Sequence, residues 1–179
     1  MARGTSSLKR VSASRRTNPV HWVVCEGSTE KRCLDELRQR WRLRGVTVKL
    51  VGDVGDPMGV YTTALHKAKE LKREHGGRWT VHVVFDRDDH ENFDEAVRLC
   101  RRAGFSMGVS VPCFELWAIL LHHDQGAELS ASEAQQLLSK RHRGYDHKHY
   151  PYLDVQLVLA GLDDAHRRGS EVVERLRAT

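Results

Sequence analysis

Residues 80–90 read Thr-Val-His-Val-Val-Phe-Asp-Arg-Asp-Asp-His, and this stretch decides the fold. Its first six residues are mostly β-branched or aromatic, which is typical of a strand buried in a sheet. The strand is followed at once by acidic residues. Open α/β sheets place their functional sites at the carboxyl ends of parallel strands. The stretch therefore predicts a central strand with a site at its end.

The acidic end of this stretch contains two aspartates at alternate positions, Asp86 and Asp88. In an extended segment, side chains two positions apart leave the same face of the chain. Two carboxylates on one face suit Mg²⁺ or Mn²⁺, which take oxygen ligands and also bind phosphate oxygens. Alternatively, an acidic turn simply ends the strand and begins the next helix, because the Asp-x-Asp pattern by itself is a weak motif.

Strand and helix patterns alternate on both sides of the central strand. Short apolar runs predict further strands at residues 20–25, 46–51 and 105–111. Apolar residues at helical spacing predict helices at residues 30–42, 58–74 and 92–103. This β-α alternation predicts an open, mostly parallel α/β sheet with helices on both faces.

The last third of the chain has a helical pattern. Pro112 suits the first turn of a helix that reaches residue 121, because proline lacks only an N–H that is unpaired at that position. Further helices are expected at residues 131–140, 153–168 and 170–177, with the last two packed on one sheet face. We therefore expect one domain over residues 19–179, with an α/β core at about 20–125 and a helical extension at about 126–179.

The basic residues are unevenly distributed along the chain. The formal net charge is +5, and five basic residues precede Glu26, the first acid. Residues 1–18 are rich in Ser, Arg and Lys, so we expect a disordered tail. Such a tail can steer a protein toward nucleic acid, or it can serve only solubility.

Membrane association and disulfide bonds are not expected. No apolar run approaches the ~20 residues needed to cross a bilayer, and no signal-peptide core is present. The four cysteines form no C-x-x-C pair, which argues against a zinc site or a disulfide framework. These features predict a reduced, cytoplasmic protein.

Three glutamates extend the set of candidate site residues. Glu26 directly follows the first strand, at the same sheet edge as the two aspartates, and Glu30 suits a helix start. Glu115 is the only charge between residues 109 and 121. A buried carboxylate is costly unless it is paired, protonated or bound to a metal. Alternatively, Glu115 lies on the solvent-exposed face of its helix.

Residues 141–151 mix bases, imidazoles and tyrosines. This composition can bind phosphates and stack on bases, and the candidate contacts are Arg141, Arg143, His147, Lys148 and His149. A solvated loop held by two tyrosine anchors would have the same composition.

Three blocks of the chain resemble the RloB-like family. Residues 24–30 (Val-Cys-Glu-Gly-Ser-Thr-Glu) resemble its "cEG-x-TE" opening, and residues 84–90 are similar to its "vfDrDdh" block. Residues 110–117 resemble its "SNPcFElW" block, with Val111 in place of the usual Asn. Residues 145–148 are similar to a later "Y-x-K" element, with one additional residue before Lys148.

The resemblance implies a Toprim-type fold, the metal-binding α/β domain of topoisomerases, primases and related nucleases. It implies a Mg²⁺ or Mn²⁺ site and a nuclease that cleaves RNA, such as tRNA, or DNA in bacterial defence against phage. A protein partner from the same defence locus is implied as possible, and the oligomeric state stays open. The alternative is a non-catalytic module that binds nucleic acid or a partner.

The same resemblance assigns the site residues. Glu26, Asp86 and Asp88 would form the metal site, Glu30 and Asp89 would support it, and Glu115 and Lys148 would join the catalytic set.

Overall fold

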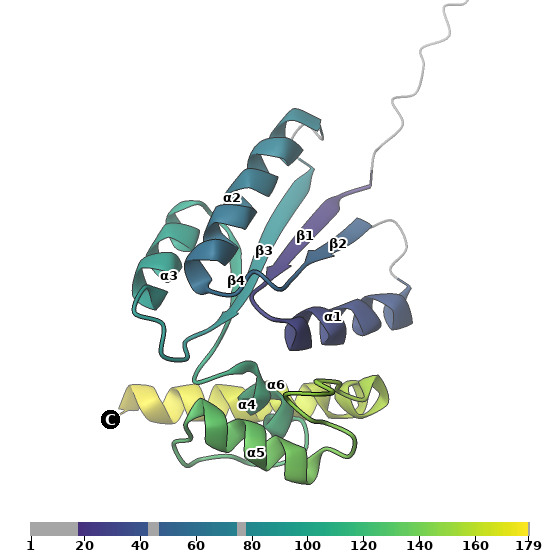
Figure 1. The fold of residues 1–179 in the computed structure, drawn as a ribbon, viewed down its shortest axis with the longest axis vertical. Coiled ribbons are helices and arrows are strands. Elements are labelled where there is room, and N and C mark those ends of the chain that lie inside the picture. Colours follow the sequence, from purple (N-terminus) through teal and green to yellow (C-terminus); the bar gives the residue numbers. More distant parts are fainter. Residues whose placement is uncertain (1–17, 43–46, 75–77, 179) are drawn as a thin grey trace, which may run out of the picture.

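A computed structural model of the chain describes residues 18–42, 47–74 and 78–178. Apart from Asn18, the expected basic tail at residues 1–18 lies outside the described residues. Within the described part, the fold is an open α/β sheet followed by a helical extension (Figure 1).

Four parallel strands form the sheet in the order β2-β1-β3-β4 (Figure 1). The strands are β1 (Val20–Cys25), β2 (Thr47–Val51), β3 (Trp79–Asp86) and β4 (Ser106–Ser110). The two strands with the most buried residues, β1 and β3, lie at the centre, where both sheet faces are covered. The expected parallel α/β sheet is thus confirmed, and all of its strands are parallel.

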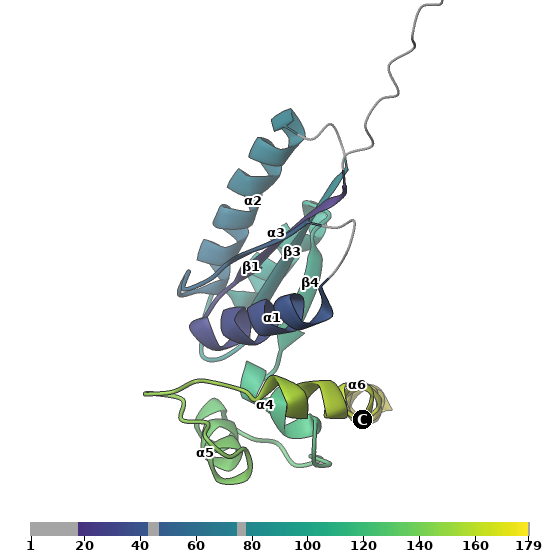
Figure 2. The ribbon, with the colours of Figure 1, turned by 90° about the vertical axis from the view of Figure 1, so that its right-hand side faces the viewer.

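Helices cover both faces of the sheet (Figure 2). Helices α2 (Pro57–Glu74) and α3 (Phe93–Arg102) lie on one face, and α1 (Ser28–Trp41) lies on the other. Side chains alternate along a strand, so Val81, Val83 and Phe85 all point toward α2 and α3. They form a buried cluster with Val60 and Ala64 of α2. This core holds β3 rigidly up to its acidic end.

The helical extension packs beyond the carboxyl edge of the sheet (Figure 1). It consists of α4 (Phe114–Leu120), α5 (Ala131–Arg141) and α6 (Val155–Ala178). A second buried cluster joins Leu37 of α1 to Ile119, Leu138 and Val158 of the three helices. Because α1 contributes to this cluster, the extension is attached directly to the sheet layer.

The extension differs from the sequence-based expectation in two respects. Pro112 is not in a helix, because Cys113 is extended (φ −147°, ψ 169°) and α4 begins at Phe114. The C-terminal region is one continuous helix rather than two, and it packs against α4 rather than on a sheet face. Gly169 does not interrupt α6, since its position lies close to the side chain of Leu120 and packing offsets the low helix propensity of glycine.

The cysteines and the helices of the described residues can also be compared with the expectations from the sequence. All four cysteines are unpaired and buried. None of the described helices combines the length and the apolar composition needed to span a membrane.

Candidate functional site

A cavity of about 230 Å³ lies where the carboxyl ends of β1 and β3 meet the helical extension. Its walls come from four separate parts of the chain: the β1–α1 turn, the end of β3, the start of α4, and the α5 region with the loop after it. The lining residues are Glu26, Gly27, Ser28, Thr29, Glu30, Asp86, Asp88, Cys113, Phe114, Glu115, Gln135 and His147. Five of these side chains are carboxylic acids, so we call it the acidic cavity.

Glu26 lies directly after β1 and is 9% exposed. Its Oε2 accepts a hydrogen bond from the backbone N–H of Asp86 (3.1 Å), and its Oε1 lies 2.9 Å from Nε2 of His90. Burial raises the pKa of Glu26, while the Asp86 amide and the His90 imidazole act in the opposite direction. These contacts connect the ends of the two central strands.

Asp86 is the last residue of β3 and is 7% exposed. Its Oδ2 accepts a hydrogen bond from the backbone N–H of Phe114 (2.9 Å), which connects the strand to the start of α4. Its Oδ1 is buried and has no hydrogen-bond partner among the described residues. Burial, followed by the nearby charge of Glu30, raises the pKa of Asp86 to about 8. When Asp86 is ionised, its buried Oδ1 therefore requires a bound cation; otherwise the carboxyl group retains its proton.

Asp88 reaches the cavity by a different route from the one its spacing predicts. The strand ends at Asp86, and Asp88 lies in the following turn with φ 34°, a left-handed conformation that aspartate tolerates better than most residues. Its backbone N–H donates to the carbonyl of Pro112 (3.0 Å). Burial raises the pKa of Asp88. A turn, not an extended strand, brings Asp86 and Asp88 to one cavity.

Glu30 lies in the first turn of α1 and is 4% exposed. Its Oε2 lies so close to Gly27 that a Cβ there would sit 2.8 Å away, so the turn after β1 has no room for a side chain. Burial raises the pKa of Glu30 to about 7, with further contributions from the charges of Glu115 and Glu26. Asp89, the other expected support, is exposed and does not line the cavity.

Glu115 is 3% exposed, so the alternative of a solvent-exposed helix face is wrong. Its Oε1 accepts a short hydrogen bond from the hydroxyl of Tyr145 and lies 3.0 Å from Nδ1 of His147. Burial, followed by the charge of Glu115, raises the pKa of the Tyr145 hydroxyl, which therefore stays a proton donor. The loop after α5 thus supplies hydrogen-bond partners for Glu115, the only acid in α4.

The other basic residues of this loop lie outside the cavity. Arg141, Arg143, Lys148 and His149 are exposed, and none of them lines the acidic cavity. The backbone N–H groups of Lys148 and His149 donate to Oδ1 of Asp146, at 2.9 and 3.0 Å. This turn directs the chain so that only His147 of the five candidate contacts reaches the cavity.

Three residues of the site were not assigned from the sequence. His90 belongs to the acidic stretch itself, and its position after three aspartates was the available signal. Tyr145 belongs to the "Y-x-K" element quoted above, which was the available signal, whereas no local pattern indicates that Gln135 reaches the sheet edge. Tertiary packing brings both residues to the site.

The donor chemistry of the acidic cavity suits a divalent cation. Within the described ranges, no three His, Cys, Asp or Glu side chains are already grouped as metal ligands. Mg²⁺ is commonly held by one or two carboxylates and keeps several waters, so a preformed group of three is not required. Asp86, with its unpaired Oδ1, and Asp88 are the residues that fit this role best.

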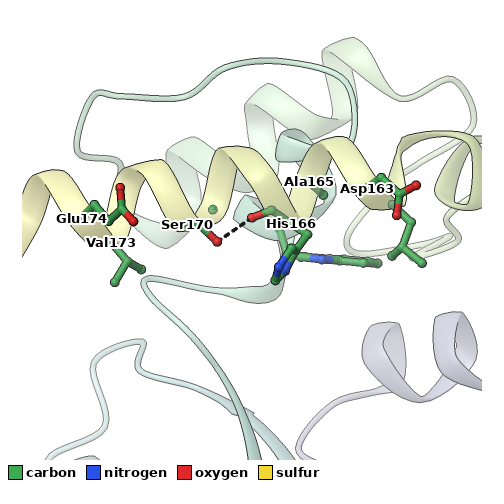
Figure 3. Close-up of a pocket in the computed structure, with 9 residues that line it drawn as sticks. Asp163, Ala165, His166, Ser170, Val173 and Glu174 are labelled. Carbon is green, nitrogen blue, oxygen red and sulfur yellow. Dashed lines mark hydrogen bonds between the residues drawn. The ribbon is translucent and has the colours of Figure 1, made fainter.

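A second hollow, along α6, has a different character (Figure 3). It is an open groove of about 820 Å³, formed by α6 and Trp117 of α4. Figure 3 shows Asp163, His166, Val173 and Glu174 along this helix, with the Ser170 hydroxyl donating to the carbonyl of His166 (2.9 Å). The groove lacks a cluster of buried acids and lies apart from the strand ends.

One of three comparisons with known proteins finds a match. The sequence profile described as RloB-like protein matches residues 21–176, which is most of the chain. Comparison with curated proteins and with solved structures finds no match. The matched range includes both the sheet edge and the helical extension that form the acidic cavity, and the chain therefore belongs to the RloB-like family.

Proposed function

We propose that this protein is a metal-dependent nuclease that hydrolyses phosphodiester bonds of RNA, such as tRNA, or of DNA in bacterial defence against phage. The observation that supports it is the acidic cavity, in which five carboxylic acids meet and a buried oxygen of Asp86 has no hydrogen-bond partner in the described part of the chain. The defence role rests on family membership and on the resemblance described above.

The carboxylates favour catalysis over simple binding of a polyanion. Phosphates are repelled by clustered acids, so a surface that only binds nucleic acid gains nothing from them. A bound Mg²⁺ or Mn²⁺ reverses this repulsion and stabilises charge on a scissile phosphate. Asp86 and Asp88 would hold the cation, and its charge would favour their ionised forms against the effect of burial.

Glu26 would act beside this pair. Its Oε2 is held by the amide of Asp86, which fixes the carboxylate relative to β3. Its Oε1 is shared with His90 and is the oxygen available to accept a proton from an attacking water. Glu30, buried in the first turn of α1 beside Gly27, would support the site through its charge.

Basic side chains around the cavity would bind the flanking phosphates. Arg141, Arg143, Lys148 and His149 are exposed on the segment that carries His147. Such contacts position a nucleic acid without reading its sequence, and they weaken as salt concentration rises. The basic residues before Glu26 would add to the same long-range attraction.

A second candidate is a non-catalytic module that binds nucleic acid or a partner protein. One observation favours it: Glu26 and Glu115 are already paired within the protein, by His90 and by Tyr145 with His147. Such pairing is also what a purely structural network of buried acids requires. The unpartnered Oδ1 of Asp86 is the feature that this alternative does not explain.

A cleavage assay separates the two candidates. Wild type, Asp86→Asn and the surface control Asp94→Asn would be incubated with plasmid, single-stranded DNA, total RNA and bulk tRNA, in Mg²⁺, Mn²⁺ or EDTA. Asn at position 86 keeps an acceptor for the Phe114 amide, whereas Asp94 is exposed on α3. We expect metal-dependent cleavage by wild type and by the control only. Equal cleavage by Asp86→Asn, or full activity in EDTA, would contradict the proposal.

A further inference from the structure

We infer that His147 donates the proton to the leaving oxygen of the cleaved phosphodiester, with Glu115 and Tyr145 as the residues that position it. This inference rests on the proposed nuclease function and assigns a role within the same cavity. It replaces the expectation that His147 serves only as a nucleic-acid contact.

The hydrogen bonds of His147 define which ring nitrogen is free to react. Its Nδ1 lies 3.0 Å from Oε1 of Glu115 and 3.3 Å from the hydroxyl of Tyr145. The Tyr145 hydroxyl already donates to the same Glu115 oxygen. Nδ1 is therefore occupied by contacts with Glu115 and Tyr145, whereas Nε2 makes no hydrogen bond to the described residues.

The difference in exposure between Glu115 and His147 suits proton transfer from His147 to a bound substrate. The Glu115 side chain is 4% exposed, whereas the His147 side chain is 42% exposed and lines the acidic cavity. The buried acid is thus shielded from water and acts through the imidazole, which remains open to a ligand. A carboxylate on Nδ1 fixes the orientation of the imidazole ring.

Acidic groups lie on both sides of the His147 imidazole. The titratable groups that face His147 are Glu115 on α4, Tyr145 on the same loop and Asp88 after β3. Two of the three are acids and the third is a neutral phenol. Lys148, the residue expected to act here from the family pattern, is exposed and does not line the cavity.

The step is a hydrolysis in which one water is consumed. The water oxygen forms the new bond to phosphorus, and the bond from phosphorus to the leaving nucleoside oxygen breaks with its electron pair on that oxygen. The Nε2 proton of the imidazolium passes to this oxygen, so that a hydroxyl leaves. The proton lost by the water passes to Oε1 of Glu26 and then to solvent, which also reprotonates His147.

The test compares two leaving groups. A natural oligonucleotide needs a proton on its leaving oxygen, whereas thymidine 5′-(p-nitrophenyl phosphate) releases a phenolate that needs none. We expect His147→Gln to lower kcat on the oligonucleotide by about 100- to 10 000-fold and to change kcat on the phenyl ester by less than about 10-fold. Glu115→Gln should show the same selectivity with a smaller loss.

Two comparisons make the outcome unambiguous. His166→Gln, exposed in the α6 groove, should leave both rates unchanged, and Lys148→Ala should raise KM on the oligonucleotide with little effect on kcat. Equal losses on both substrates for His147→Gln, or no loss on either, would overturn the inference while leaving the nuclease proposal intact. Failure of wild type to cleave any substrate with metal would overturn both.

Discussion

The two walls of the acidic cavity differ in how their buried acids are hydrogen-bonded. On the sheet wall, Asp86 ends β3 with one oxygen that lacks a partner, and burial raises the pKa of its carboxyl to about 8. On the helical wall, Glu115 is as deeply buried but is paired with Tyr145 and His147. Under the function proposed above, the sheet wall would hold the cation and the helical wall would deliver the proton.

The largest expected effect distinguishes the two walls directly. Asp86→Asn should lower cleavage by at least about 1000-fold on every substrate, including the p-nitrophenyl ester, because phosphate neutralisation is needed whatever the leaving group. His147→Gln should spare the activated ester. Steady-state rates on both substrates check this, and a leaving-group dependence in Asp86→Asn would remove the distinction between the walls.

The next effect concerns stability and pH. An unfolded Asp titrates near pH 4, whereas burial raises the pKa of Asp86 in the fold to about 8, so the folded state binds the proton more tightly. The free energy of unfolding should therefore fall as pH rises from about 4 to about 8, because ionisation of the buried group favours the unfolded chain. Asp86→Asn removes this contribution.

In EDTA, the Tm of Asp86→Asn should exceed that of wild type at pH 8 and match it near pH 4. A difference of 1 kcal/mol corresponds to about 2–4 °C for a chain of this size. Mg²⁺ should raise the Tm of wild type at pH 8 and leave the variant unchanged. Thermal melts of both proteins at several pH values check this. A difference in Tm that stays constant across the pH range would mean that ionisation of Asp86 does not cause the pH dependence of stability.

The helical wall depends on how closely α6 approaches the end of α4. A Cβ at Gly161 would collide with the backbone carbonyl of Leu121, whose carbon would be only 2.9 Å away, whereas one at Gly169 would meet only a Leu120 methyl at 3.9 Å. Gly161→Ala should therefore destabilise the fold by about 1–3 kcal/mol. Gly169→Ala, its matched control in the same helix, should stabilise it by up to about 1 kcal/mol through helix propensity.

Denaturant unfolding of the two glycine variants measures both effects. If Gly161→Ala were as stable as wild type, α6 would not set the position of α4, and the helical wall would be more adaptable than the packing indicates.

The smallest effect should come from the basic segment that precedes both walls. Removal of residues 2–17 deletes five positive charges and keeps every described residue that lines the acidic cavity. We expect a rise in KM of a few-fold at low salt that disappears as ionic strength increases, because the attraction to phosphates is screened. Cleavage rates measured across a salt series check this, and a salt-independent loss of kcat would point instead to a direct role of the segment in the site.

The sequence by itself determined the sheet and its acidic edge. Buried strands and amphipathic helices differ in periodicity, so the βα order and the parallel sheet followed from local pattern. Because parallel strands end at one edge, the positions of Glu26 and Asp86 near each other followed as well. These features depend on residues that are close in the sequence or on general rules of sheet topology.

Only the tertiary structure decided what surrounds that edge. Asp88 enters the cavity through a left-handed turn, and Glu115 meets Tyr145 and His147 from a segment some thirty residues away in the chain. Contacts of this kind leave no periodic signal, because they depend on how the helical extension packs against the sheet. The choice of His147 over Lys148 as the residue that lines the cavity depends on one turn around Asp146, which fixes where each side chain points.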